Sequence, residues 1–226
     1  MRLFFAITLP DDTRELVSDV QAALRSQVGR EGVRWEDSAK FHITVRFLGE
    51  VSEGVLPAVM EAGRRAAEAV APFELELEGL GTFPERRAPR VLWIGVKKGL
   101  PQYARFVEYL DGALMREPDK LGEALSTPNS DGAEQSEPRR PGEPRVKLHL
   151  REVGRRASPH VTLARVKSES GAKAVSRIFS EKIAKKADKK GVFFVYNVVL
   201  IESELRPEGS VFTVLETFQL AGIEAS

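Results

Sequence analysis

The amino-acid sequence predicts an α+β protein that is built from a duplicated strand–helix–strand unit around one central cleft. Strand and helix patterns follow one another in that order over residues 41–78 and again over residues 159–201. Each unit opens with the pattern His-x-Thr-x, with an apolar residue at both x positions, at residues 42–45 and 160–163. A pseudo-twofold arrangement of the units would bring the two motif strands together, and the length of 226 residues suits one large domain, or two small lobes, over residues 1–226.

The N-terminal part of the chain alternates apolar strands with an amphipathic helix. An apolar run predicts a buried strand over residues 2–9, and apolar residues at helical spacing predict a helix over 11–28 that ends at Gly29. A short strand over 33–35 precedes the first motif strand over 41–48. These elements supply the first side of the predicted cleft.

The same alternation continues through the middle of the chain. A helix is predicted over 53–70, and strict alternation of apolar residues with glutamate over 73–78 predicts a half-buried strand with a solvated acidic face. A loop over 81–90 leads to an apolar strand over 91–96. Pro101 then opens a helix with apolar residues at helical spacing.

The composition changes after this helix. Residues 116–144 are rich in Pro, Gly, Ser, Glu and Asp and hold almost no large apolar side chains. They cannot bury enough apolar surface to offset the entropy of ordering. We predict a mobile insertion here, and a regulatory or partner-binding segment is the alternative.

The C-terminal part repeats the earlier order. The second motif strand is predicted over 159–166, a helix over 170–187 and a long apolar strand over 192–201. A turn at 207–209 leads to the last strand over 211–220. This matching order is what indicates the duplication.

Composition excludes several kinds of chemistry. The 226 residues are 42% hydrophobic and 30% charged, as in an ordinary globular protein. The absence of cysteine excludes disulfides, thiolate catalysis and cysteine-ligated metals. The apolar residues 1–9 are too few to cross a membrane, and the Pro-Asp-Asp that follows them is wrong for a signal peptide. We therefore expect a cytoplasmic monomer without a membrane partner.

Charge is unevenly distributed along the chain. Residues 139–190 contain 16 Lys and Arg against five Asp and Glu, although the net charge of the whole chain is +1. A basic region around one motif suits an anionic partner such as an RNA end or a small cyclic nucleotide. A solvated face and a basic helix end would give the same count, so charge alone does not assign the partner.

The two motifs together can perform acid–base chemistry on a phosphate. Side chains two apart on a strand point to one face, so His42 and Thr44 should lie together, as should His160 and Thr162. Two imidazoles can act as general acid and general base, while hydroxyls donate to non-bridging phosphate oxygens. Arg165 adds a guanidinium fork. The residues alone leave open which histidine is the acid.

Other chemistries fit these residues less well. A metal site needs several converging ligands, and threonine is a poor one, so we expect neither a metal nor a cofactor. The sequence has no Gly-rich phosphate loop and no serine turn of the Ser-His-Asp type. The alternative for each motif histidine is a purely structural strand residue. The third histidine, His149, has no threonine partner, and we expect no catalytic role for it.

Seven runs of the sequence, two of which contain the motifs, form a recognisable set. They are MRLFFAITLP at 1–10, VRW at 33–35, FHITVRFLGE at 41–50, GTFP at 81–84, VLWIGV at 91–96, PHVTLAR at 159–165 and IESEL at 201–205. In these runs the chain resembles the two-histidine (2H) phosphoesterase superfamily, and within it the LigT-like RNA 2′,3′-cyclic phosphodiesterases, formerly named 2′-5′ RNA ligases. It departs from that pattern in the length of 116–144 and in Ala157-Ser158, where a bulky apolar residue commonly precedes Pro-His.

This resemblance implies a bilobal α+β fold with two antiparallel sheets and flanking helices around a cleft. It implies metal-free hydrolysis of a terminal RNA 2′,3′-cyclic phosphate to a 2′-phosphomonoester. By position, His42 corresponds to the proton donor, His160 to the proton acceptor, and Thr44, Thr162 and Arg165 to phosphate-binding residues. Two alternatives stay open: a 2′-5′ RNA ligase that joins tRNA halves, and a non-catalytic RNA or nucleotide binder.

Overall fold

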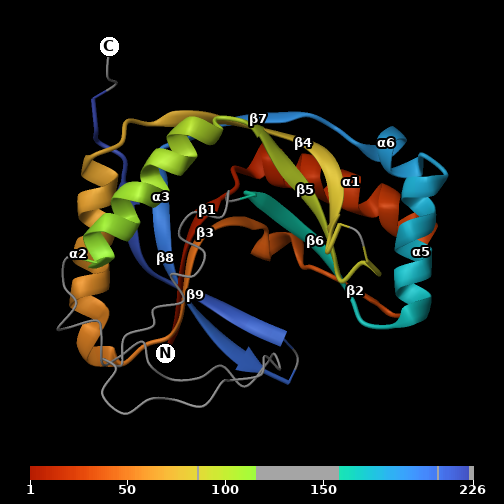
Figure 1. Cartoon of the computed structure of the whole chain (residues 1–226), viewed down its shortest axis with the longest axis horizontal. Helices are drawn as coiled ribbons and strands as arrows, with labels where there is room; N and C mark the ends of the chain where they lie inside the picture. Colours follow the sequence, from red (N-terminus) through yellow and green to blue (C-terminus); the bar gives the residue numbers. More distant parts are fainter. Residues whose placement is uncertain (86, 116–157, 208, 224–226) are drawn as a thin grey trace, which may run out of the picture.

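The computed structural model describes residues 1–85, 87–115, 158–207 and 209–223 (Figure 1). The predicted insertion over 116–144 and His149 lie outside the described residues. The strands are β1 (Arg2–Thr8), β2 (Val33–Trp35), β3 (His42–Glu50), β4 (Phe73–Phe83), β5 (Val91–Lys98), β6 (His160–Val166), β7 (Gly191–Val195), β8 (Asn197–Arg206) and β9 (Gly209–Gln219). The helices are α1 (Asp11–Val28), α2 (Leu56–Glu68), α3 (Leu100–Met115), α5 (Glu169–Ser180) and α6 (Ile183–Ala187), with 3₁₀ turns at Ser38–Lys40 and Glu53–Val55.

The strands pair in an antiparallel order that is symmetric about its middle. The path runs β7-β4-β5-β6-β3-β1-β8-β9, and β2 adds to β6. Read outward from the centre, one lobe is β3, β1, β8 and β9, and the other is β6, β5, β4 and β7. Each lobe therefore takes two strands from the other half of the chain, since β8 and β9 join β1, and β4 and β5 join β6 and β7.

The two motif strands lie side by side at the centre of this order. A single residue pair, Ile43 with Val161, joins β3 to β6. The two antiparallel sheets expected from the sequence therefore meet at one point and form a continuous path. The predicted α+β class with a pseudo-twofold arrangement is confirmed by this topology.

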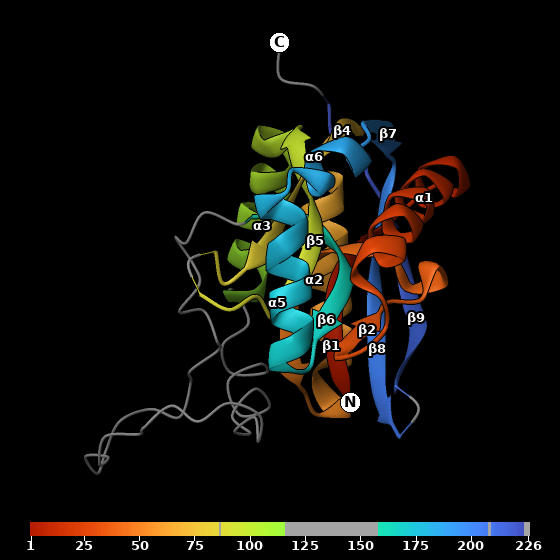
Figure 2. The ribbon, with the colours of Figure 1, turned by 90° about the vertical axis from the view of Figure 1, so that its right-hand side faces the viewer.

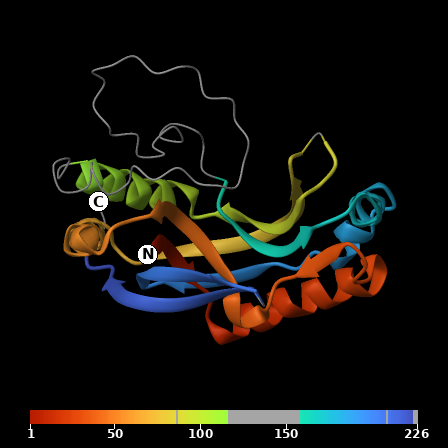
Figure 3. The same ribbon diagram turned by 90° about the horizontal axis from the view of Figure 1, so that it is seen from below.

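Helices cover the two lobes in separate groups. Helices α2 and α3 pack on each other, and α2 packs on β8 and β9 of the first lobe. Helices α1, α5 and α6 pack together on the second lobe (Figure 2). A view from below shows these groups at opposite ends of the molecule (Figure 3). Within the described ranges, no helix is long and apolar enough to cross a membrane.

Side chains of β1 alternate between two apolar clusters. Leu3, Phe5 and Ile7 belong to the main core, together with side chains of the helices. Because successive strand residues point to opposite faces, the intervening side chains form a smaller cluster on the other face. That cluster consists of Phe4, Ala6, Val199, Ile201 and the partly buried Phe212. It lies on the same face as the site described below.

The prediction of one strand over 192–201 is wrong at its middle. The run divides at Tyr196, because β7 pairs with β4 of the second lobe while β8 pairs with β1 of the first. The helix predicted over 170–187 also divides, where Lys182 adopts a left-handed φ of 58°. Local periodicity continues across both breaks, so it does not reveal the change of partner.

The acidic face predicted for 73–78 is only partly solvated. Glu74 and Glu78 are exposed, but Glu76 is only 2% exposed. Its carboxylate accepts from Lys190 Nζ at 2.8 Å and Lys98 Nζ at 2.9 Å. Hydrogen bonds from these two lysines hold the pKa of Glu76 below its usual value. Strand β4 also continues to residue 83, into the segment predicted as a loop.

Candidate active site

The register of the motif strands places four polar side chains on one face of the sheet. Ile43 and Val161 pair across the β3–β6 junction, and both are fully buried. Their sequence neighbours point the other way. We call this the motif face, and none of the four side chains on it is buried: His42, Thr44, His160 and Thr162.

The antiparallel register also mixes the two motifs. Because Ile43 lies opposite Val161, His42 is set beside Thr162 and His160 beside Thr44. In this register each motif histidine lies across from the threonine of the other motif. His42 Nε2 also lies 3.1 Å from Thr44 Oγ1 of its own strand. A ligand at the junction can therefore contact both motifs at once.

Matching backbone contacts orient the two imidazoles. His42 Nδ1 lies 2.7 Å from the carbonyl oxygen of Lys40, and His160 Nδ1 lies 2.8 Å from that of Ser158. A carbonyl oxygen only accepts, so Nδ1 carries the proton in both rings. Nε2 is therefore the nitrogen that can exchange a proton with a ligand. It accepts a hydrogen bond when the ring is neutral and donates one when the ring is protonated.

Two aromatic rings pack against each imidazole. Around His42 these are Phe4 and Phe212, with ring centroids at 5.1 Å and 5.5 Å. Around His160 they are Phe83 and Trp93, at 5.0 Å and 6.0 Å. One ring of each pair comes from the strand next to the motif strand, Phe4 from β1 and Trp93 from β5, whereas Phe212 comes from β9 and Phe83 from β4. They remove water from the imidazoles and fix their tilt.

Burial lowers the pKa of both imidazoles below the ordinary value of 6.5. The carbonyl contacts at Nδ1 oppose this shift, and the positive charge of Arg165 adds to it for both rings. Within the described part of the chain, a carboxylate contributes for His42 and not for His160, because the charge of Glu36 favours the protonated form of the His42 ring. The charged surroundings of the two histidines therefore differ, although their packing matches.

A β-bulge in β6 brings Arg165 to the motif face. The ladder between β5 and β6 shifts register next to Leu163, and Leu163 and Ala164 are both fully buried. One extra residue reverses the alternation beyond it. Strict alternation would have turned Arg165 inward, whereas the bulge sets it on the same face as His160 and Thr162. From this face the positive charge of Arg165 lowers the pKa of both histidines.

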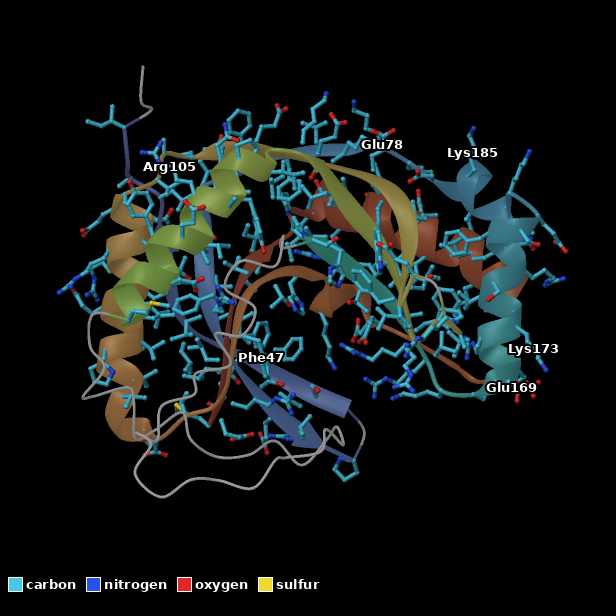
Figure 4. The ribbon with its side chains drawn as sticks, in the orientation of Figure 1. Phe47, Glu78, Arg105, Glu169, Lys173 and Lys185 are labelled. Atoms are coloured by element: carbon cyan, nitrogen blue, oxygen red, sulfur yellow. The ribbon has the colours of Figure 1, made fainter. Side chains whose placement is uncertain are left out.

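Strand β3 has a register shift at the corresponding place. The ladder between β1 and β3 shifts next to Val45, so that Arg46 faces the helices and binds Asp111 of α3. Phe47 returns to the motif face opposite Phe4, and Figure 4 shows it beside the β8–β9 hairpin. The fifth residue after each motif histidine thus reaches the motif face, as a phenyl ring in one lobe and a guanidinium in the other.

The chain is similar to known proteins along nearly its whole length. Residues 7–93 match the family described as LigT like Phosphoesterase. The RNA 2′,3′-cyclic phosphodiesterase of Thermus thermophilus is 31% identical over 223 residues, covering 98% of this chain and 91% of that protein. The chain belongs to the LigT-like phosphoesterase family. The protein of the same name from Methanothermobacter thermautotrophicus is 28% identical, covering 97% of this chain and 99% of the other.

Solved structures of similar proteins share the fold. The crystal structure of a Thermus thermophilus protein has a TM-score of 0.68 and 27% identity, covering 98% of this chain and 99% of that one. E. coli LigT complexed with 3′-AMP has a TM-score of 0.62 and 23% identity, covering 97% and 96%. These likenesses confirm the LigT-like fold that the sequence predicted.

The five site residues predicted from the sequence gather on the motif face. Two are the motif histidines, two are their threonines, and the fifth is Arg165. Ser158, noted as a departure from the family pattern, supplies the carbonyl that orients His160, and Ala157 lies outside the described residues. Within the part of the chain that the structure describes, no three His, Asp or Glu side chains are grouped to hold a metal.

Sequence reasoning missed the aromatic rings around the histidines and the carboxylate of Glu36. Phe83 and Trp93 stand in segments that resemble the family, yet their contact with His160 depends on the β4-β5-β6 strand order. Glu36 directly follows the short predicted strand at 33–35, without a local pattern that marks it. Arg165 was identified from the second motif itself, whereas the only signal for Phe47 was that it stands, like Arg165, five residues after a motif histidine.

Proposed function

We propose that this protein is an RNA 2′,3′-cyclic phosphodiesterase that opens a terminal cyclic phosphate to a 2′-phosphomonoester. The observation that carries the proposal is the β3–β6 junction, where two oriented imidazoles, two hydroxyls and one guanidinium share a face. Relatives named RNA 2′,3′-cyclic phosphodiesterase, alignable over most of the chain, support the substrate class.

The chemistry requires one base and one acid at a single phosphorus atom. His160 Nε2 takes a proton from water, whose oxygen forms the new bond to phosphorus. The bond between phosphorus and O3′ breaks, and His42 Nε2 gives its proton to the departing oxygen. Thr44 and Thr162 donate to the non-bridging oxygens, and Arg165 offsets the negative charge that builds there.

The assignment of His42 as donor follows the family resemblance, and one feature of the structure supports it. Among the described residues, the negative charge of Glu36 favours the protonated form of His42, and no carboxylate does the same for His160. We further propose that the substrates are RNA ends or small cyclic nucleotides. We also propose that the protein acts as a cytoplasmic monomer without a metal or cofactor.

An oligoribonucleotide that ends in a 2′,3′-cyclic phosphate tests the proposed reaction. We expect the reaction to proceed in the presence of EDTA, because the donors to the phosphate are protein side chains. We expect the 2′-phosphate alone as the product, because the proposed donor protonates O3′. Chromatography or ³¹P NMR identifies the product. Adding tRNA halves with a free 5′-hydroxyl tests the alternative, since a 2′-5′ joined product would indicate a ligase. Binding without turnover would contradict the enzyme proposal.

The pKa shifts predict a pH optimum on the acid side of 6.5. The donor must hold its proton, so activity falls as the pH rises through the pKa of His42. The acceptor must be neutral, so activity falls as the pH drops through the pKa of His160. Burial lowers both pKa values, and both limbs move to lower pH. The measurement is kcat/KM against pH, and a flat profile from about pH 5 to 9 would contradict paired histidine catalysis.

A further inference from the structure

Glu36 lies just after β2, and its side chain reaches across to β6. Its Oε1 accepts a hydrogen bond from Arg165 Nε at 2.9 Å. The carboxylate is mostly buried, with 19% of the side chain exposed, whereas Arg165 is 49% exposed. Arg34 Nη2 is 3.9 Å from the same carboxylate oxygen, on the strand position paired with Arg165. Glu36 is therefore the fixed member of the pair, and Arg165 is the member that faces solvent.

The contact with Glu36 uses Nε and not the two Nη groups at the outer edge of the guanidinium. Within the described residues, the two Nη groups of Arg165 donate no hydrogen bond. These groups form the planar fork that matches two oxygens of a phosphate. A carboxylate on Nε limits rotation of that fork about the long side chain. A hydrogen-bond donor that is already oriented before the phosphate binds stabilises the developing negative charge more strongly, because it does not have to reorganise during the reaction.

The side chain of Gln21, on α1, is hydrogen-bonded to the backbone near both members of the Glu36–Arg165 pair. Its amide nitrogen donates to the carbonyl oxygens of Glu36 at 2.8 Å and of Leu163 at 2.9 Å. The N–H of Glu36 donates to the same Leu163 oxygen at 2.9 Å. Gln21 is only 8% exposed, so both of its amide hydrogens are used in a buried place. Leu163 is the residue of the bulge that sets Arg165 on the motif face.

We propose that Glu36, anchored by Gln21, is a positioning residue that orients the Arg165 guanidinium toward the phosphate. The inference rests on the proposed function, because it takes the motif face to be a phosphate site. This role also explains why a carboxylate lies close to an anion-binding site. The negative charge of Glu36 is balanced by the ion pair with Arg165 and by the nearby positive charge of Arg34. The first motif has no such pair, because Phe47 occupies the position that corresponds to Arg165.

Two substitutions at one position separate positioning from charge. Glu36→Gln and Glu36→Ala remove the same negative charge, but only the glutamine keeps an oxygen that can accept from Arg165 Nε. We expect kcat/KM on a terminal cyclic phosphate to be about tenfold lower for Glu36→Ala than for Glu36→Gln. Glu61→Ala is the matched control, because Glu61 accepts from Arg65 Nε at 2.8 Å on the exposed side of α2. It should leave kcat/KM unchanged.

The difference between the two variants must depend on Arg165. In an Arg165→Ala background, Glu36→Gln and Glu36→Ala should have equal kcat/KM, because no guanidinium remains to be oriented. A difference that persists in this background would mean that Glu36 acts on the fold and would overturn the proposal. Gln21→Met, which keeps the side-chain length without donors, should lower kcat/KM only while Arg165 is present.

Calorimetric titration with inorganic phosphate keeps this inference separate from the proposed reaction. If the wild-type protein binds phosphate but leaves RNA cyclic phosphate intact, the proposed function fails. Positioning then stands if Glu36→Ala binds phosphate more weakly than Glu36→Gln and if Arg165→Ala abolishes that difference. Equal phosphate affinities of the two variants, or absence of phosphate binding in the wild-type protein, would overturn it. Thermal unfolding verifies that each variant is folded.

Discussion

Replacement of His42 or His160 by alanine is expected to lower kcat/KM on a terminal RNA 2′,3′-cyclic phosphate by about 10²–10⁴-fold each. Each substitution removes an Nε2 that is oriented by a carbonyl at Nδ1 and packed between two aromatic rings. The double variant should lose little more than the worse single variant, because acid and base act on one phosphorus atom. Single-turnover and steady-state rates measure the loss.

A substrate with a better leaving group identifies which histidine is the donor. A phosphodiester that releases p-nitrophenolate needs no proton on the departing oxygen. His42→Ala should therefore regain most of its rate on that substrate, whereas His160→Ala should stay slow because water still needs a base. His149→Ala is the control and should match the wild-type protein. If the His160 variant regains its rate on the p-nitrophenyl substrate instead, the assigned roles are reversed. If both variants keep more than about a tenth of wild-type activity on the RNA cyclic phosphate, neither histidine has the assigned role.

Asp111→Ala is expected to lower the free energy of unfolding by about 3–5 kcal/mol, because it leaves Arg46 buried without its partner. Arg46 Nε donates to Asp111 Oδ1 at 2.7 Å, and Nη2 donates to Oδ2. The two side chains are only 12% and 10% exposed. Nearby, Tyr103 Oη donates to the carbonyl oxygen of Thr44 at 2.9 Å, so α3 holds β3 directly beneath the motif face.

Urea unfolding of this variant measures the change, with an exposed ion pair as the control. Arg206→Ala removes the partner of Glu204, and those side chains are 50% and 60% exposed, so the free energy of unfolding should change very little. Replacing Arg46 and Asp111 together by apolar residues should recover much of the loss, since no buried charge is then unpaired. A change below about 1 kcal/mol for Asp111→Ala would show that water reaches Arg46.

Most elements were predictable because their signals are local. A continuous apolar run marked β1, alternation marked β3 and β6, and helical spacing with Gly29 marked α1 within its observed bounds. The errors fall at two kinds of place. At Tyr196 the chain passes from a strand that pairs with β4 to one that pairs with β1. At Glu76 the carboxylate forms ion pairs with lysines from other strands or segments and is buried by them. The local sequence pattern does not change at such places, so it cannot predict which distant strand or side chain a residue contacts.

By itself the sequence determined that each histidine shares a strand face with the threonine two residues later, because side chains alternate along any strand. It also indicated the family, through the repeated motif. The tertiary structure alone decided that the two strands meet at Ile43 and Val161, which sets the motifs beside each other. It also decided that a bulge at Leu163, pinned by Gln21, brings Arg165 to that face beside Glu36. Register and bulges depend on hydrogen bonds between residues far apart in the chain, and no local pattern encodes them.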